Sequence, residues 1–166
     1  MDIGVLKHLR SGLKTIVKDT SDYIRIFNDI CKIPKESFDL EQELYLTPLL
    51  LLEIRNFAEK MDFDIVLGIA AVGLDVRFGQ AEFGPEARAA IISLYRLYPE
   101  YYAQAENKNL FLSRVLKEGL HEIGHILGGD HCINNCIMKF SQTVTDIDMK
   151  PIAFCEGCRE KILKSS

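Results

Sequence analysis

Apolar residues recur at helical spacing in three long stretches of the chain. The first covers residues 3–17, and the second covers about residues 47–60, where Thr47 is a favourable N-cap followed by Pro48. The third covers about residues 110–127. Its apolar stripe advances in steps of three or four residues, through Leu112, Leu116, Leu120, Ile123 and Leu127. We expect a helix in each stretch.

Four other segments have the composition or the alternation of β-strands: residues 22–27, 65–70, 74–78 and 89–97. In the third of them, Leu74, Val76 and Phe78 alternate with polar residues, which predicts one wet face. The fourth is ambiguous between helix and strand, and its adjacent isoleucines favour a strand. Loops are expected at residues 33–43 and 99–109, and a last short helix at about residues 156–163.

The order of these segments predicts an α/β (α+β) fold in which a mixed sheet packs on helices. A length of 166 residues suggests one domain, spanning residues 1–166. Within it we distinguish the sheet and helices (1–109), a helix and its following loop (110–131), and a cysteine-bearing end (132–166).

Charge and apolar content limit the classes of partner. A net charge of −4 and a pI near 5.6 give no general footprint for nucleic acid. The start of the chain lacks the apolar core of a secretory signal, and the longest apolar run, residues 49–52, is far too short to span a bilayer. We therefore expect a cytoplasmic protein without membrane or nucleic-acid partners. The sequence does not specify its oligomeric state.

The third predicted helix ends in a group of residues suited to zinc chemistry. His121 and His125 are four residues apart, so both imidazoles lie on one helical face and can bind one ion. Glu122 need not bind the metal and is placed to take a proton from the zinc-bound water. Gly128 can end the helix with a positive φ, after which His131 can complete a three-histidine site.

The length of this pattern separates it from a chance match. HExxH alone occurs in many unrelated chains, and a single histidine is usually structural or solvated. Here HExxHxxGxxH fixes five positions and falls at the end of an independently predicted amphipathic helix. The combination predicts a catalytic zinc with His121, His125 and His131 as ligands and Glu122 as general base.

Four of the five cysteines lie near the end of the chain in two closely spaced pairs. Cys132 and Cys136 form a C-x3-C pair, and Cys155 and Cys158 form a C-x2-C pair. Four thiolates would close a tetrahedral site, so we predict a second, structural zinc. The alternative is two unrelated reduced pairs or a redox-active CxxC. Cys31 stands apart and is expected to be a small buried hydrophobe.

The combined pattern resembles the archaemetzincins, a family of metzincin-type zinc metallopeptidases. The resemblance rests on the histidine run, on Cys136–Ile137–Met138 and on the later cysteine pair. It implies a compact zincin domain with a twisted sheet, peptide substrates, aminopeptidase-like action as one option, and Met138 beneath the catalytic zinc. Each of two cysteine-containing spacers is one residue shorter than the family pattern. Residues 78–81 and 93–97 resemble family segments with lower specificity.

Two alternatives to a peptidase remain from the sequence. Bacterial endoribonucleases of the rRNA-maturation family have a similar three-histidine run, but they carry glycine where Glu122 stands and lack the four cysteines. A non-catalytic zinc-binding module would not need Glu122 as a base. We further expect Gly79 or Gln80 to lie at the rim of the cleft, on an edge strand that can pair with an extended peptide; the alternative is a turn glycine far from the site.

Overall fold

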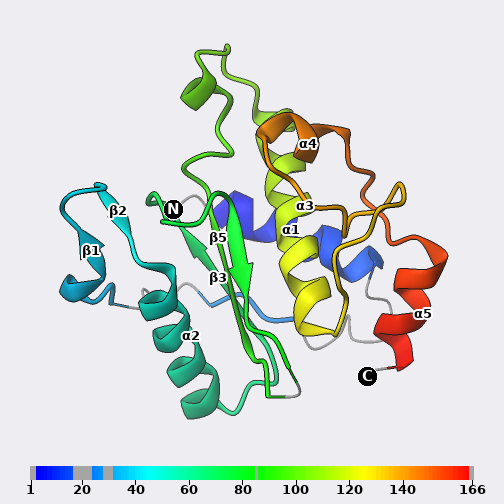
Figure 1. Ribbon diagram of the computed structural model, residues 1–166, viewed down its shortest axis with the longest axis horizontal. Helices are drawn as coiled ribbons and strands as arrows, with labels where there is room; N and C mark the ends of the chain where they lie inside the picture. The colour runs from blue at the N-terminus through cyan, green and yellow to red at the C-terminus, as the bar shows by residue number, and fades with distance from the viewer. Residues whose placement is uncertain (1–2, 17–23, 28–31, 85, 165–166) are drawn as a thin grey trace.

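The computed structural model describes residues 3–16, 24–27, 32–84 and 86–164 (Figure 1). Its elements follow the chain in the order α1 (Ile3–Ile16), the 3-10 helix η2 (Lys35–Ser37), β1 (Phe38–Asp39), β2 (Leu44–Tyr45), α2 (Thr47–Met61), β3 (Val66–Ala70), β4 (Gly79–Ala81), β5 (Ala89–Ser93), the 3-10 helix η3 (Pro99–Tyr102), α3 (Lys108–Ile126), α4 (Val144–Met149) and α5 (Glu156–Lys164). The predicted mixed α/β fold is confirmed.

The main sheet has three strands in the order β3-β5-β4. The central strand, β5, pairs in parallel with β3 and antiparallel with β4, in the register Gly79↔Ile92. All five residues of β5 are buried, as expected for a strand covered on both faces. β4 therefore lies at one edge of this sheet. A separate two-stranded ribbon joins β1 to β2.

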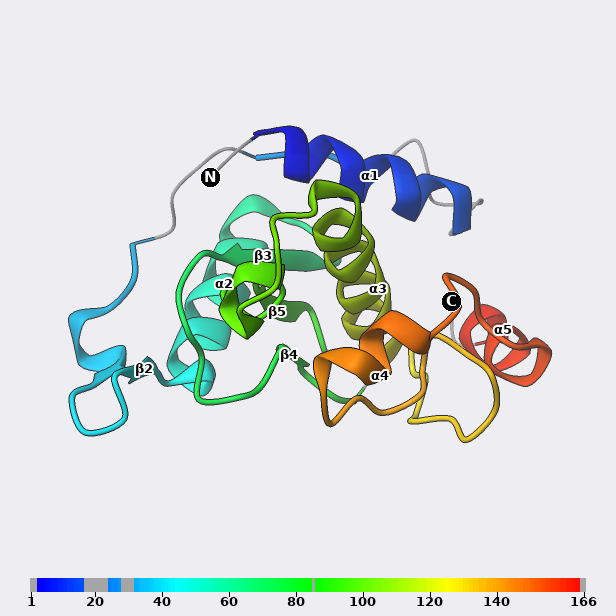
Figure 2. The same ribbon diagram turned by 90° about the horizontal axis from the view of Figure 1, so that it is seen from above.

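Helices cover both faces of the main sheet. α2 packs on one face, and α3 packs on the other with α1 across its outer side (Figures 1 and 2). Because side chains alternate along a strand, neighbouring residues of β5 enter different cores. Ile91 belongs to the cluster beneath α2, and Ile92 belongs to the cluster that includes α3 and α1.

Two glycines allow α1 and α3 to pack closely. A Cβ added at Gly12 would overlap Leu116 of α3, and one added at Gly119 would overlap Leu9 of α1. The missing side chains thus make room for a leucine from the opposite helix. This contact buries the outer side of α3 and leaves its other face for the sheet and the cleft.

Two buried basic residues of α3 anchor α4. The Arg114 guanidinium donates to both carboxylate oxygens of Asp148 at 2.8 Å and to the backbone carbonyl of Leu97 at 3.1 Å. Lys117 Nζ donates to the carbonyl oxygens of Ile147 and Asp148, at 3.0 and 2.7 Å. Cations near the last carbonyls of a helix also stabilise it electrostatically. α4 is therefore held firmly against α3.

The predicted start of the second helix is wrong in one detail. The N-cap of α2 is Leu46, and Thr47 is already helical. The Thr47 side chain is buried and donates to Asp75, which also accepts from the Thr47 backbone N–H at 2.8 Å. Since the threonine is bonded to a distant carboxylate, it joins α2 to the segment before β4 instead of capping the helix.

The predicted strand at residues 74–78 is also wrong. Apart from a single bridge between Leu74 and Tyr45, this segment has no strand pairing, and β4 begins at Gly79. Leu74 and Phe78 are buried all the same, so their alternation with polar residues reports burial in an irregular segment. The bond of Asp75 to Thr47 ties this segment to the start of α2.

The other predictions differ in smaller ways. Residues 24–27 have no regular secondary structure, so the predicted strand at 22–27 fails there; residues 22 and 23, like Cys31, lie outside the described residues. The strand predicted at 89–97 ends at Ser93, the two predicted loops contain short 3-10 helices, and α4 was not predicted. No helix in the described part of the chain is both long and apolar enough to cross a membrane.

Candidate active site

The last turns of α3 carry the first two predicted ligands. Asn107 caps the helix by accepting from the backbone N–H of Leu110 at 3.0 Å. From there the helix runs unbroken to Ile126, so His121 and His125 lie one turn apart on one face, with ring centroids separated by 4.6 Å. Both imidazoles are buried, at 5% and 6% exposure.

Backbone carbonyls orient these two imidazoles. Nδ1 of His121 bonds to the carbonyl oxygen of Ile137 at 3.0 Å, and Nδ1 of His125 bonds to that of Gly129 at 2.8 Å. Because a carbonyl can only accept, each Nδ1 carries the proton, and each Nε2 presents a lone pair. Such bonds are the usual means of fixing the tautomer of a metal-binding histidine.

The two Nε2 atoms then face each other at 3.2 Å. Two lone pairs at that distance repel unless a cation lies between them. Ligand nitrogens about 2.05 Å from a tetrahedral zinc are separated by about 3.3 Å. The spacing of His121 and His125 therefore fits a shared zinc ion.

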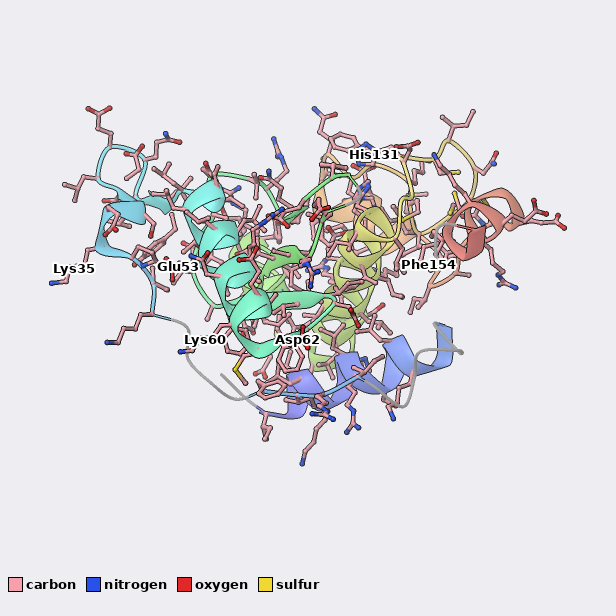
Figure 3. The ribbon with its side chains drawn as sticks, turned by 90° about the horizontal axis from the view of Figure 1, so that it is seen from below. Lys35, Glu53, Lys60, Asp62, His131 and Phe154 are labelled. Carbon is pink, nitrogen blue, oxygen red and sulfur yellow. The ribbon has the colours of Figure 1, made fainter. Side chains whose placement is uncertain are left out.

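A tight turn brings the third histidine back to this pair. Gly128 has a φ of 84°, and the Gly129 N–H donates to the carbonyl oxygen of Gly124 at 2.8 Å. His131 then lies with its ring 4.8 Å from that of His125, and the ligand atoms of the three histidines are all within 4.8 Å of one another. Figure 3 shows His131 on the loop that follows α3.

Burial keeps the three imidazoles neutral. It lowers the pKa of His121 from 6.5 to about 3 and lowers the pKa of His125 and of His131 as well. Lys150 and the other histidines add to the effect on His121. Only the neutral imidazole can give a lone pair to a metal. The environment thus favours the form that binds metal.

The predicted base lines the cleft beside these ligands. Glu122 is 4% exposed and lines the cleft. One of its carboxylate oxygens lies 2.8 Å from the position that a Cβ on Gly79 would occupy. Burial, and then the neighbouring Glu118, raise its pKa well above the ordinary value, while Lys150 opposes them. Of the two residues expected at the cleft, Gly79 and Gln80, Gly79 is part of its lining, so it is not a turn glycine far from the site.

Met138 is fully buried beneath the histidine-bearing turn of α3. Its sulfur occupies the space that a side chain on Gly124 would need, and Gly124 directly precedes His125 in the sequence. Its carbonyl oxygen accepts from the backbone N–H of Cys132 at 2.9 Å. The segment with Met138 therefore supports both α3 and the loop that carries His131.

The four cysteines come together as a second group. Their sulfur atoms all lie within 4.8 Å of one another, and those of Cys132 and Cys155 are 3.7 Å apart. Sulfurs bound at about 2.3 Å to a tetrahedral zinc are separated by about 3.8 Å. The N–H of Cys155 also donates to the sulfur of Cys136 at 3.2 Å. The group thus has the spacing and chemistry of a closed zinc site.

α5 (Glu156–Lys164) supports the cysteine group. α5 begins directly after Cys155, and Phe154 lies between α3 and α5 (Figure 3). An ion pair joins Lys161 of α5 to Asp130, the residue before His131. The loop with the third histidine is therefore held from α5 as well as from the cysteine group.

The structure brings together every site residue predicted from the sequence, and it adds several that were missed. Glu118, Phe140 and Ser141 line the cleft, and Lys150 pairs with Glu118. Only Glu118 had a signal in the sequence, since it lies one helical turn before Glu122 on the same face. The others follow α3 after long loops, and no periodic pattern places them.

Phenylalanines flank the three-histidine group on two sides. The ring of Phe83 lies edge-on to His125 at 5.3 Å, and that of Phe140 lies edge-on to His131 at 5.0 Å. Both rings remain largely exposed, at 68% and 60%. They give the rim of the site an apolar character.

Known proteins resemble this chain in sequence and in fold. The model of peptidase family M54 matches residues 23–164. An archaemetzincin from Pyrococcus abyssi is 39% identical over 137 residues, which cover 79% of this chain and 72% of that protein.

Two solved structures have a similar fold along almost the whole chain. The crystal structure of an archaemetzincin from Methanopyrus kandleri gives a TM-score of 0.82 at 28% identity, covering 99% of this chain and 87% of that one. That of a zinc-dependent peptidase from Methanocorpusculum labreanum gives 0.83 at 27% identity, covering 98% and 95%.

Proposed function

The chain belongs to peptidase family M54 and is a zinc-dependent peptidase, and on this premise we propose that its catalytic zinc is held by His121, His125 and His131. One observation carries the assignment. The Nε2 atoms of the two helical histidines face each other at 3.2 Å while both Nδ1 protons are committed to carbonyl oxygens. A cation shared by the two lone pairs satisfies this arrangement.

The residues around this site have separate tasks. When bound, zinc polarises a peptide carbonyl and makes water more acidic. Glu122 lines the cleft without belonging to the histidine group, and we assign it the proton transfers: it accepts a proton from the attacking water and delivers one to the leaving amine. His131 is the most exposed of the three histidines, so it faces the side from which a substrate arrives.

The substrate backbone has a surface to pair with. β4 is the edge strand of the main sheet, and Gly79 at its start adjoins Glu122. The outer N–H and C=O groups of an edge strand can pair with an extended peptide. We propose that a peptide adds to β4 and thereby lies across the histidine group.

The second zinc is proposed to be structural. Four thiolates leave no open position for water or substrate, so this ion would support the fold and not the reaction. Its ligands would be Cys132, Cys136, Cys155 and Cys158. Because Cys132 directly follows His131, the same loop would serve both ions.

Metal content gives the first prediction. The folded chain is expected to hold two zinc ions, since the three histidines and four cysteines form separate groups. Elemental analysis of protein purified without chelator measures the ratio of zinc to protein. A ratio of one, unchanged when Cys155 and Cys158 are replaced by serine, would rule out the structural site.

Gly79→Ala gives the second prediction. An added Cβ would lie 2.8 Å from both a Glu122 carboxylate oxygen and the backbone carbonyl of Ile91, so the base must move. We expect kcat/KM to fall by about tenfold or more, with zinc content unchanged. Gly157→Ala is the control, because a Cβ there meets no atom within 4 Å. Equal kinetics for the two variants would show that Gly79 does not adjoin the base.

One experiment separates the peptidase from the other two functions that fit parts of the sequence. Zinc-loaded protein is tested for hydrolysis of peptides and of RNA, with Glu122 intact and with Glu122→Gln. A peptidase cleaves peptides in a manner that depends on Glu122. Cleavage of RNA would indicate the endoribonuclease, and cleavage of neither would indicate a non-catalytic zinc module.

A further inference from the structure

One polar atom in the cleft has no partner. The cleft has a volume of about 340 Å³ and adjoins the three-histidine group, and Ser141 is part of its lining. The serine is only 9% exposed, and its hydroxyl is the one buried side-chain polar atom among the described residues that makes no hydrogen bond. Such a group is costly unless something binds it, so it marks a place for a ligand atom.

The ion pair of Glu118 and Lys150 adjoins the same space. Glu118 lines the cleft, is 2% exposed, and lies 3.5 Å from Nζ of the equally buried Lys150. Whether the proton is on the lysine or on the glutamate, the pair is neutral as a whole. A carboxylate offers about four lone-pair sites, and the bond from Lys150 uses one of them. Glu118 can therefore accept a further hydrogen bond from a group in the cleft.

These neighbours restrict the chemistry of an occupant. A charged side chain of either sign would lose its water at a buried position beside a pair that is neutral as a whole, and the two other charged residues of the lining, Glu122 and Arg77, are of opposite sign. A purely apolar side chain would leave the Ser141 hydroxyl without a partner. A neutral group with both a donor and an acceptor satisfies every neighbour.

The carboxamide of asparagine or glutamine has these two functions at the end of a short side chain. Its NH₂ can donate to Glu118 while its oxygen accepts from the Ser141 hydroxyl. Val76 and Phe140, which also line the cleft, would contact the methylene groups. We propose that this part of the cleft selects a substrate residue with a carboxamide side chain, with Ser141 and Glu118 as the specificity-determining residues. The inference rests on the proposed peptidase function.

The test compares peptides of equal size. Each of the two residues that flank the scissile bond is varied in turn among Asn and Gln, their apolar counterparts Leu and Met, and the charged Asp and Lys. The readout is the ratio of kcat/KM for a carboxamide peptide to that for its apolar counterpart, measured for the native protein and for Ser141→Ala. Ser113→Ala, on α3 outside the cleft lining, is the matched control.

We expect the native protein to prefer a carboxamide at one of the two positions by about tenfold or more in kcat/KM. Ser141→Ala should reduce this preference by about tenfold, which is the effect of one lost hydrogen bond. Ser113→Ala should leave the ratio unchanged. Ser141→Ala removes a hydroxyl that has no partner, so its melting temperature should not fall. A native preference for charged or apolar residues at both positions, or an unchanged ratio in Ser141→Ala, would overturn the inference.

Binding separates this inference from the proposed function. The same peptides are titrated calorimetrically into zinc-loaded Glu122→Gln protein, with and without Ser141→Ala. If the native protein hydrolyses none of the peptides, the peptidase assignment fails, but the ratio of Kd values still decides the subsite. A carboxamide preference in Kd that depends on Ser141 supports the inference, and its absence rejects it.

Discussion

Replacing Glu122 by glutamine is expected to lower kcat/KM for peptide hydrolysis by about a hundredfold or more while the zinc content stays at the native level. Glutamine has the shape of glutamate but cannot accept the proton of the attacking water. The side chain is buried in the cleft and is not one of the histidine ligands, so its replacement removes a function without removing a ligand. Steady-state kinetics and elemental analysis on the same samples measure both quantities.

Two further variants make this result specific. His121→Ala should lose zinc together with activity, because it removes a ligand whose orientation the carbonyl oxygen of Ile137 fixes. Glu106→Gln changes an exposed glutamate just before α3 and should leave both quantities unchanged. Near-native activity of Glu122→Gln would contradict the role assigned to this residue.

The double variant Cys155→Ser, Cys158→Ser should show the largest loss of stability. Structural zinc sites contribute roughly 10–16 kcal/mol of apparent binding free energy in zinc-finger peptides, and here the site joins the chain end to the loop after α3. We expect one zinc to be lost per chain and the melting temperature to fall by many degrees. Since Cys132 adjoins His131, activity should fall as well.

Calorimetry, elemental analysis and kinetics together test this expectation. Cys31→Ser is the matched control for zinc content, since it replaces a cysteine outside both pairs. Two zinc ions per chain and a native melting temperature in the double variant would show that the cysteine group is not a metal site. Loss of one zinc with full activity would show that the two sites are independent.

Features set by local spacing could be predicted from the sequence. The periodic stripe of α3 predicted a helix, and the helix alone places His121 and His125 on one face. Gly128 has the positive φ that the turn toward His131 requires. The spacing of the cysteine pairs likewise predicted a group that the structure brings together.

Features set by distant contacts could not be predicted. Thr47 has the properties of an N-cap, but its hydroxyl bonds to Asp75, far along the chain. Apolar and polar residues alternate from Leu74 to Phe78 because the apolar ones are buried, and an irregular segment can bury them as well as a strand can. Glu118 and Lys150 pair although they are 32 positions apart in the sequence. No pattern around either residue predicts its partner.

The way α4 is attached leaves part of the cleft wall free to change. Lys117 holds α4 through the carbonyl oxygens of Ile147 and Asp148, and Arg114 holds it through the Asp148 carboxylate, so none of these bonds involves the cleft residues before α4. The wall of the cleft with Phe140 and Ser141 leads into this attached helix. Substitutions in the wall can therefore accumulate without detaching it. A change of peptide preference can in this way arise in the wall while the three histidines and Glu122 stay as they are.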